Sequence, residues 1–204
     1  MYIPGHFAAD EQAVDDLLAH HGAADLITAT PDGLVATMLP FVYDRGARTL
    51  RGHLARQNDQ WRRPALGEAL VIVRGPDAYI SPGWYPSKAE HGRVVPTWNY
   101  ITAHVYGRLT VHDDPAWVER NVRDLTGRHE AGRPRSWSVD DAPPPFIEGQ
   151  LRAIVGVELL ITRVEAKLKL SQNRSAADVD GVISGLIADG REDAAEAVRR
   201  ARPA

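Results

Sequence analysis

The most constraining feature of this sequence is an alternation of apolar and polar residues at positions 99–111. The apolar positions are Ile101, Ala103, Val105, Leu109 and Val111. Tyr, Thr, His and Arg side chains occupy most of the positions between them. Because successive side chains of a strand point to opposite faces, the pattern predicts one long, half-buried β-strand. Gly107 lies on the apolar face, where it predicts either a close approach of another backbone or simple packing.

Other segments also have the composition of strands. Residues 24–30 and 34–44 are β-rich and flank the turn sequence Pro31-Asp32-Gly33, which predicts a hairpin. Further strands are expected at 49–54 and at 69–75, with an extension of the latter through the AYI segment. From residue 154 onward the apolar set changes phase near residue 163, so this region predicts either a β-bulge or a break between two strands.

Helices are expected at three places. Acidic residues open a helix over 10–21, and Asp114 with Pro115 predicts the start of a second helix that ends at Gly127. Ser175, with Asp178 three residues later, resembles a capping box before helix-spaced apolar residues. A final Ala- and Arg-rich stretch is interpreted as helical or frayed, and 81–97 and 128–144 as surface loops.

Six or seven strands in a meander with few helices define the expected fold class. The chain is interpreted as mainly β with peripheral helices, an α+β antiparallel barrel, because no alternating βαβ pattern is present. A doubly wound sheet is therefore not expected. We expect one domain over residues 1–174 and a C-terminal helical appendage over 175–204.

Composition removes several classes of function. The chain has 204 residues, no cysteine and a formal net charge of -3, so disulfides, thiolate metal sites and global attraction to nucleic acid are not expected. It contains no dinucleotide-binding fingerprint, P-loop, HExxH or GxSxG motif. No two histidines have the i, i+4 spacing of a helical metal site, and we expect no metal. Neither a membrane-length apolar run nor a secretory leader is visible, which predicts a cytoplasmic protein.

Four local clusters contain side chains that could bind a ligand. Each cluster admits two interpretations. Residues 53–61 and 167–174 are strand ends rich in cations and amides, suited to a phosphate or a polar ring edge, or simply solvated. Residues 79–88 and 95–100 are rich in aromatic side chains, which either cover a flat ligand or pack inside the protein. Taken singly, none of the four decides between binding and packing.

Their order along the chain resembles that of the PaiB-type family of FMN-binding split-barrel proteins. The matching segments are MYIPGHF, HLARQNDQW, YISPGWY, VPTWNY with HVYG, and KLSQNRS. The resemblance spans residues 1 to about 190. It implies a split β-barrel like that of pyridoxamine-phosphate oxidases, a homodimer, FMN sites at the subunit interface, and a role as a negative transcriptional regulator.

The resemblance also implies which residues bind the cofactor. The strand-end residues that would face the flavin and its phosphate are His53, Ala55, Arg56 and Asn58. Trp98 and Asn99 would come from the other protomer, and Ser171 and Gln172 belong to the C-terminal motif. No catalytic residue is assigned.

Two other functions remain open at this point. Similar barrels host flavin-dependent oxidoreductases and haem-degrading enzymes, so haem is the alternative cofactor, with substrate beneath Trp84, Tyr85 and Trp98. His53 or His104 would then assist proton transfer or serve a structural role. Direct DNA binding has little support, because no helix-turn-helix pattern is visible and the expected helices carry few cations. A structural dimer that has lost its ligand is the third alternative.

Overall fold

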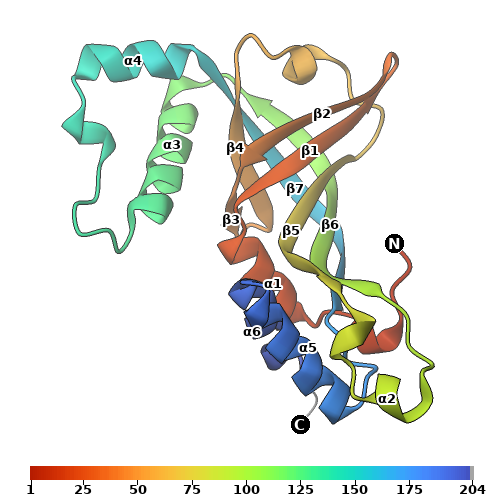
Figure 1. The fold of residues 1–204 in the computed structure, drawn as a ribbon. Coiled ribbons are helices and arrows are strands. Elements are labelled where there is room, and N and C mark those ends of the chain that lie inside the picture. The colour runs from red at the N-terminus through yellow and green to blue at the C-terminus, as the bar shows by residue number, and fades with distance from the viewer. Residues whose placement is uncertain (203–204) are drawn as a thin grey trace. The chain divides into compact units, whose positions relative to one another are not determined.

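A seven-stranded antiparallel sheet forms the framework of the computed structural model, which describes residues 1–202 (Figure 1). The strands are β1 (Ala23–Thr30), β2 (Gly33–Pro40), β3 (Val42–Asp44), β4 (Thr49–Ala55), β5 (Ala69–Ile80), β6 (Thr97–His112) and β7 (Ile154–Lys169). Their order in the sheet is β2-β1-β5-β6-β7-β4-β3, so the sheet is not a simple meander. The predicted mainly-β fold class is confirmed.

Six α-helices are present in the described part of the chain. They are α1 (Glu11–His20), α2 (Ser87–His91), α3 (Pro115–Glu130), α4 (Pro144–Arg152), α5 (Ala176–Ala188) and α6 (Glu192–Arg200). Short 3-10 turns lie at Gly5–Phe7, Asp59–Arg62, Pro82–Trp84 and Val139–Asp141. Within residues 1–202, no helix has both the length and the apolar character needed to cross a membrane.

Strand β6 confirms the expectation drawn from the alternating segment and explains its glycine. Ala103 and Val105 are fully buried, whereas Val111 is exposed near the end of the strand. A Cβ added at Gly107 would lie 2.3 Å from the carbonyl oxygen of Leu160 in β7. The close backbone approach, one of the two predicted reasons for this glycine, is therefore what the structure shows.

The β1–β2 hairpin also forms as predicted, with Thr30 opposite Gly33 and a φ of 115° at the glycine. Strand β2 ends close to β4, since a Cβ at Gly52 would lie 2.8 Å from Leu39 Cδ1 and 3.0 Å from the Pro40 carbonyl oxygen. This proximity of non-neighbouring strands is how the sheet closes on itself. Only a glycine fits at this point of β4.

The structure decides between some sequence expectations and corrects others: the loop predicted at 81–97 contains helix α2 (Ser87–His91). Strand β7 continues through Arg163 without a break, although burial changes phase there, with Ile161 and then Ala166 buried. Helix α3 passes Gly127 and ends at Glu130, because one helical glycine weakens a helix without stopping it. Helix α4 was not expected at all. Its first residue is a proline, which is tolerated in the first turn, where the N–H has no partner.

The chain divides into two compact units, each described here by itself. Unit 1 consists of Met1–Leu17, Arg74–Ala103 and the described residues from Glu165 onward; unit 2 consists of Leu18–Val73 and His104–Val164. The division predicted at residue 174 stays a prediction.

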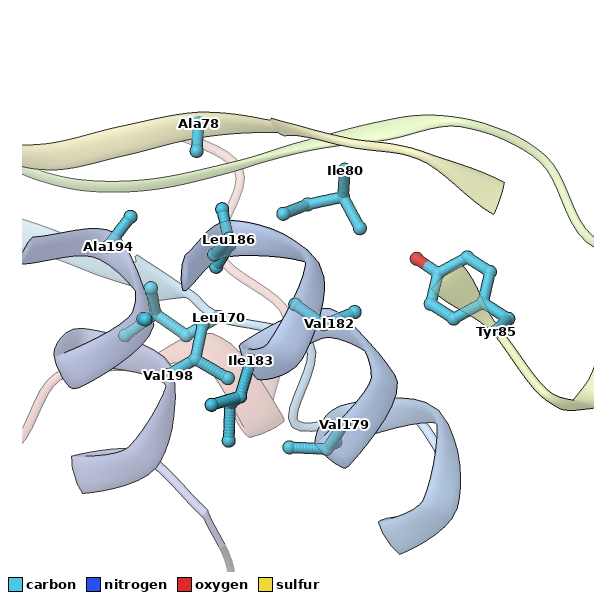
Figure 2. Packing of buried hydrophobic residues seen from close by; sticks show 11 residues of the cluster. Ala78, Ile80, Tyr85, Leu170, Val179, Val182, Ile183, Leu186, Ala194 and Val198 are labelled. Carbon is cyan, nitrogen blue, oxygen red and sulfur yellow. The ribbon is translucent and has the colours of Figure 1, made fainter. Parts of the chain in front are cut away.

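In unit 1, helices α5 and α6 pack on the end of β5 around one apolar core. Figure 2 shows Ala78 and Ile80 of β5 beside Val182 and Leu186 of α5. The side chain of Ser175 accepts a hydrogen bond from the backbone N–H of Asp178, which confirms the predicted cap. The Asp178 carboxylate accepts hydrogen bonds from Ser87 instead of closing the box.

In unit 2, helix α3 packs on the face of the sheet formed by β4 and β7. Arg51 of β4 donates to Asp124 at 2.9 Å. The ring of Trp117 occupies the space above Gly156 of β7, where a Cβ would lie 2.2 Å from Trp117 Cζ3. Trp117 also stacks on His112, with 4.1 Å between ring centroids. Asp114 caps the helix as predicted, accepting from Ala116 and Trp117 N–H groups.

Candidate cofactor site

Three cationic side chains gather at the end of β7 in unit 1, and we call them the cationic cluster: Lys167, Lys169 and Arg174. Lys167 and Lys169 are two residues apart on a strand and therefore share a face. Among the described residues, none of the three pairs with a carboxylate. Unpaired cations held this close together are suited to an anionic ligand.

Lys167 is 8% exposed, which is unusual for a lysine. Its Nζ donates to the Tyr2 carbonyl oxygen at 3.3 Å. The same nitrogen lies 5.5 Å from the ring centroid of Tyr100 and 5.8 Å from that of Phe7. Cation–π attraction to these rings replaces part of the hydration that burial removes.

Lys169 lies at the mouth of the cluster. Its ammonium donates to Thr97 Oγ1 and, at 2.9 Å, to the Trp98 carbonyl oxygen. Burial lowers the pKa of Lys169; Tyr100 opposes this shift, and the positive charges of Lys167 and Arg174 add smaller lowering effects. A dianionic phosphate placed here would relieve the mutual repulsion of the three cations.

An aromatic surface lies next to this cluster. The indole of Trp98 is 49% exposed, and its Nε1 donates to Asp77 at 2.9 Å. The Tyr79 ring, 48% exposed, meets it edge to face with 6.2 Å between centroids. The exposed indole thus offers a flat aromatic surface to solvent, with the Tyr79 ring inclined to it by 61°. Tyr85 is instead buried at 2% in the core of unit 1, where it packs.

Two of the predicted cofactor residues, Asn99 and Ser171, are hydrogen-bonded to each other, and a third, Gln172, braces the adjacent turn. Asn99 and Ser171 are buried, and Asn99 Nδ2 donates to Ser171 Oγ at 2.9 Å. Ser171 has a φ of 68°, a left-handed conformation that is costly for serine. Gln172 holds the turn, accepting from the Leu170 N–H and donating to the Leu168 carbonyl, both at 2.7 Å. These residues fix the shape of the strand end beside the cations.

The other predicted cofactor residues lie in unit 2 at the end of β4. The Arg56 guanidinium donates to Asp113 and to the carbonyl oxygens of Arg152, at 2.7 Å, and Ile154, at 3.0 Å. The hydrogen bond with Asp113 raises the pKa of Arg56 and lowers that of the carboxyl. Most of the guanidinium's donors are therefore engaged within the protein.

Asn58 is held by hydrogen bonds within the protein, whereas Ala55 is exposed to solvent. Asn58 Oδ1 accepts from the Gln60 N–H at 3.0 Å, and Asn58 Nδ2 donates to Thr37 at 2.9 Å. Ala55 is exposed at the strand end. Both belong to the same strand-end segment as Arg56.

His53 lies on the same face of β4 as Arg51, the face covered by α3. Its Nδ1 is buried and has no hydrogen-bond partner among the described residues, and burial lowers the pKa of the imidazole. A buried ring nitrogen without a partner is uncommon, so this atom has unused hydrogen-bonding capacity.

The groups at the end of β7 fit the requirements of FMN. The cofactor needs cations for its phosphate and a flat surface for its ring system, and the cationic cluster and Trp98 supply both. From the sequence, residues 167–174 were recognised as basic. That these cations lack acidic partners depends on tertiary structure, so sequence reasoning did not single them out.

Comparison with solved structures identifies the class of protein. Rv2991 of Mycobacterium tuberculosis matches with a TM-score of 0.60 and 12% identity over 86% of this chain and 94% of that one. The FAD and heme binding protein of Mycobacterium smegmatis matches with a TM-score of 0.55 and 19% identity, covering 86% of this chain and 78% of that one. The fold is therefore that of the split-barrel flavin-binding proteins, as the resemblance implied.

Sequence comparison identifies the family. The family model described as "Putative FMN-binding domain" matches residues 1–163. The chain belongs to this FMN-binding family, which confirms the predicted family and cofactor class.

Two curated relatives show how far the similarity extends. Bacillus subtilis "Protease synthase and sporulation protein PAI 2" is 30% identical over 91% of this chain and 89% of its own length. An uncharacterised Aspergillus fumigatus protein is 36% identical over 68% of this chain and 66% of its own length. This chain therefore spans most of the bacterial relative and about two thirds of the fungal one.

Proposed function

We propose that this protein binds FMN, with the cofactor phosphate at the cationic cluster and its ring system against Trp98. The observation that carries the proposal is the set of three cations that have no acidic partner within residues 1–202, beside an exposed indole. When bound, FMN supplies electron or hydride transfer through its isoalloxazine ring. Lys169 would hold the phosphate, and Asn99 with Ser171 would keep the strand end in shape.

We further propose that the protein works as a cytoplasmic homodimer whose FMN sites lie at the subunit interface. In this arrangement the β4-end residues of one protomer complete a site that contains Trp98 and Asn99 of its partner. Sedimentation velocity with and without FMN tests the dimer. A monomer in both conditions would contradict it.

Replacing Lys169 with alanine tests the cofactor site. The variant loses a charge-assisted hydrogen bond to phosphate, whose loss is worth about 1.5–3 kcal/mol, so FMN should bind about tenfold to a hundredfold more weakly. Quenching of flavin fluorescence on titration measures the affinity. Lys88→Ala, which removes an exposed lysine from α2, is the matched control. Equal affinities for Lys169→Ala and the control would contradict the proposed site.

A role in negative transcriptional regulation is the second candidate, supported by the name of the Bacillus subtilis relative, which refers to protease synthesis and sporulation. The net charge of -3 gives DNA no general attraction. Fluorescence anisotropy with DNA upstream of the gene, at low salt, tests direct binding. Absence of binding would leave regulation only through another protein or a small molecule.

An oxidoreductase or haem-degrading enzyme is the alternative function. It is supported by the names of two structural relatives, the Azotobacter vinelandii flavocytochrome Anf3 and the Mycobacterium smegmatis FAD and heme binding protein. An absorbance spectrum of the purified protein separates flavin bands from a Soret band. Turnover of NADPH by the flavin-loaded protein would favour the enzyme, and inertness toward nicotinamides and haem would exclude it.

A further inference from the structure

We propose that a cleft between α3 and α4 in unit 2 binds a small amphipathic organic cation. The cleft encloses about 370 Å³ and is walled by α3, the 3-10 turn Val139–Asp141 and α4. This volume falls within the range of about 300–1,000 Å³ typical of small-molecule sites. The cleft lies on a part of the chain that supplies none of the residues proposed to hold FMN.

The floor of the cleft is apolar. Its lining includes Val139, Pro144, Ile147 and Leu151. Helix α4 contributes three of these side chains, yet no residue of α4 is fully buried. The apolar side of this helix therefore faces a space that the described chain leaves open, and an apolar ligand body would gain free energy by covering it.

The charged part of the lining is acidic. Three carboxylates, those of Glu119, Asp140 and Glu148, face a single guanidinium, that of Arg123, which leaves two net negative charges. A cavity with this balance attracts a cation and disfavours an anion.

Arg123 is not available to a ligand, because the protein itself engages it. It donates to Glu119 at 2.9 Å and, through both terminal nitrogens, to Asp140 at 2.9 and 3.1 Å. Among the described residues, Glu148 has only a distant partner, Arg152, at 3.9 Å, and both side chains are about two-thirds or more exposed. Glu148 is therefore the carboxylate placed to pair with a ligand ammonium.

These features select the ligand class. In the part of the chain that the structure describes, no group of His, Asp or Glu side chains is arranged to hold a metal ion. The combination of an apolar floor, an acidic rim and an occupied guanidinium fits a ligand with an aromatic or aliphatic body and one amine. Charge complementarity therefore points to a small amine.

Isothermal titration of the full chain with three indole compounds tests the proposal. Tryptamine carries an ammonium, indole is neutral, and indole-3-acetate carries a carboxylate. We expect tryptamine to bind most tightly and indole-3-acetate least. Ala142→Trp, which fills the cleft from its lining, should abolish binding of both tryptamine and indole. FMN affinity should not change, so failure here is separable from failure of the cofactor proposal.

A charge variant with a matched control tests the role of the acidic rim. Glu148→Gln should weaken tryptamine binding by up to about fivefold at low salt and leave indole unaffected, as expected for a partly exposed ion pair. Glu192→Gln removes an exposed carboxylate from α6 in unit 1 and should change neither. Equal binding of the three compounds, tryptamine binding insensitive to Ala142→Trp, or a change of oligomeric state in that variant would overturn the proposal. The last result would show that a second copy covers the cleft.

Discussion

The role of a single arginine shows how an ion pair and a ligand contact compete for the same donors. Arg56 was predicted to face the flavin phosphate, and in unit 2 its guanidinium joins the end of β4 to Asp113 and to two backbone carbonyls. Both side chains of the pair are partly exposed, so the ion pair alone adds little stability. Contact with the phosphate stays a prediction, and its test needs both partners.

Two variants separate these roles of Arg56. We expect Arg56→Ala to lower both the melting temperature and FMN affinity, because it removes the backbone hydrogen bonds and the predicted phosphate donor together. Asp113→Asn should lower only the melting temperature, since it leaves the guanidinium in place. Thermal unfolding and flavin titration measure the two effects. If Asp113→Asn weakens FMN binding as much as Arg56→Ala does, the role of Arg56 is structural.

Two buried histidines should make stability depend on pH. Burial lowers the pKa of both His21 and His53 below the ordinary value of 6.5. The folded state therefore binds fewer protons than the unfolded chain near pH 6, and stability falls as the pH drops below about 6.5. Each histidine contributes a slope of at most about 1.4 kcal/mol per pH unit.

Denaturant unfolding between pH 8 and pH 5 measures this dependence. We expect a loss of stability below pH 6.5 that is smaller in His53→Gln, which keeps a polar side chain without titrating in this range. An identical pH profile for the variant and the parent protein would show that His53 contributes nothing to the effect.

At the scale of the elements, helix α5 packs so closely on its neighbours that it accepts only glycine at two positions. A Cβ at Gly185 would lie 2.2 Å from the Trp84 ring, and one at Gly181 would lie 2.0 Å from the Trp84 carbonyl oxygen. Trp84 thus packs against the helix, as the packing alternative for this loop predicted. The aromatic loop and α5 share one contact surface.

A pair of glycine variants tests this packing. Gly185→Ala should destabilise the protein by about 1–3 kcal/mol, because the added methyl group overlaps the indole. Gly149→Ala in α4 meets only a flexible arginine tip at 3.9 Å and should be neutral or stabilise by about 0.5–1 kcal/mol. Urea unfolding gives both values. Similar effects of the two substitutions would contradict tight packing of α5 on Trp84.

The sequence predicted elements wherever one pattern was continuous. The alternation around Val105 gave β6, the turn before Gly33 gave the hairpin, and the Asp114 and Ser175 caps gave the starts of α3 and α5. Helix α4 was not predicted from the sequence, because prolines dominate its start. The pairing of Asn99 with Ser171, 72 residues apart, is set by the sheet and has no local signal.

At the scale of the molecule, the family and fold were accessible from the order of five short segments, whereas the partition of the chain was not. Unit 1 gathers three segments that are distant in sequence. Its core joins Ala78 and Ile80 of β5 to helices α5 and α6. The contacts of such a unit join residues more than 80 positions apart in the sequence. No local change in composition therefore marks its boundary.

The late position of Lys169 and of helices α5 and α6 also affects how the protein is made. A nascent chain that has emerged only through β6 lacks the third segment of unit 1, so Ile80 and Ala78 have neither α5 nor α6 to pack against. The same last segment carries the cationic cluster. A chain synthesised only through β6 therefore has neither the helices that cover this core nor the cations proposed to hold the flavin phosphate.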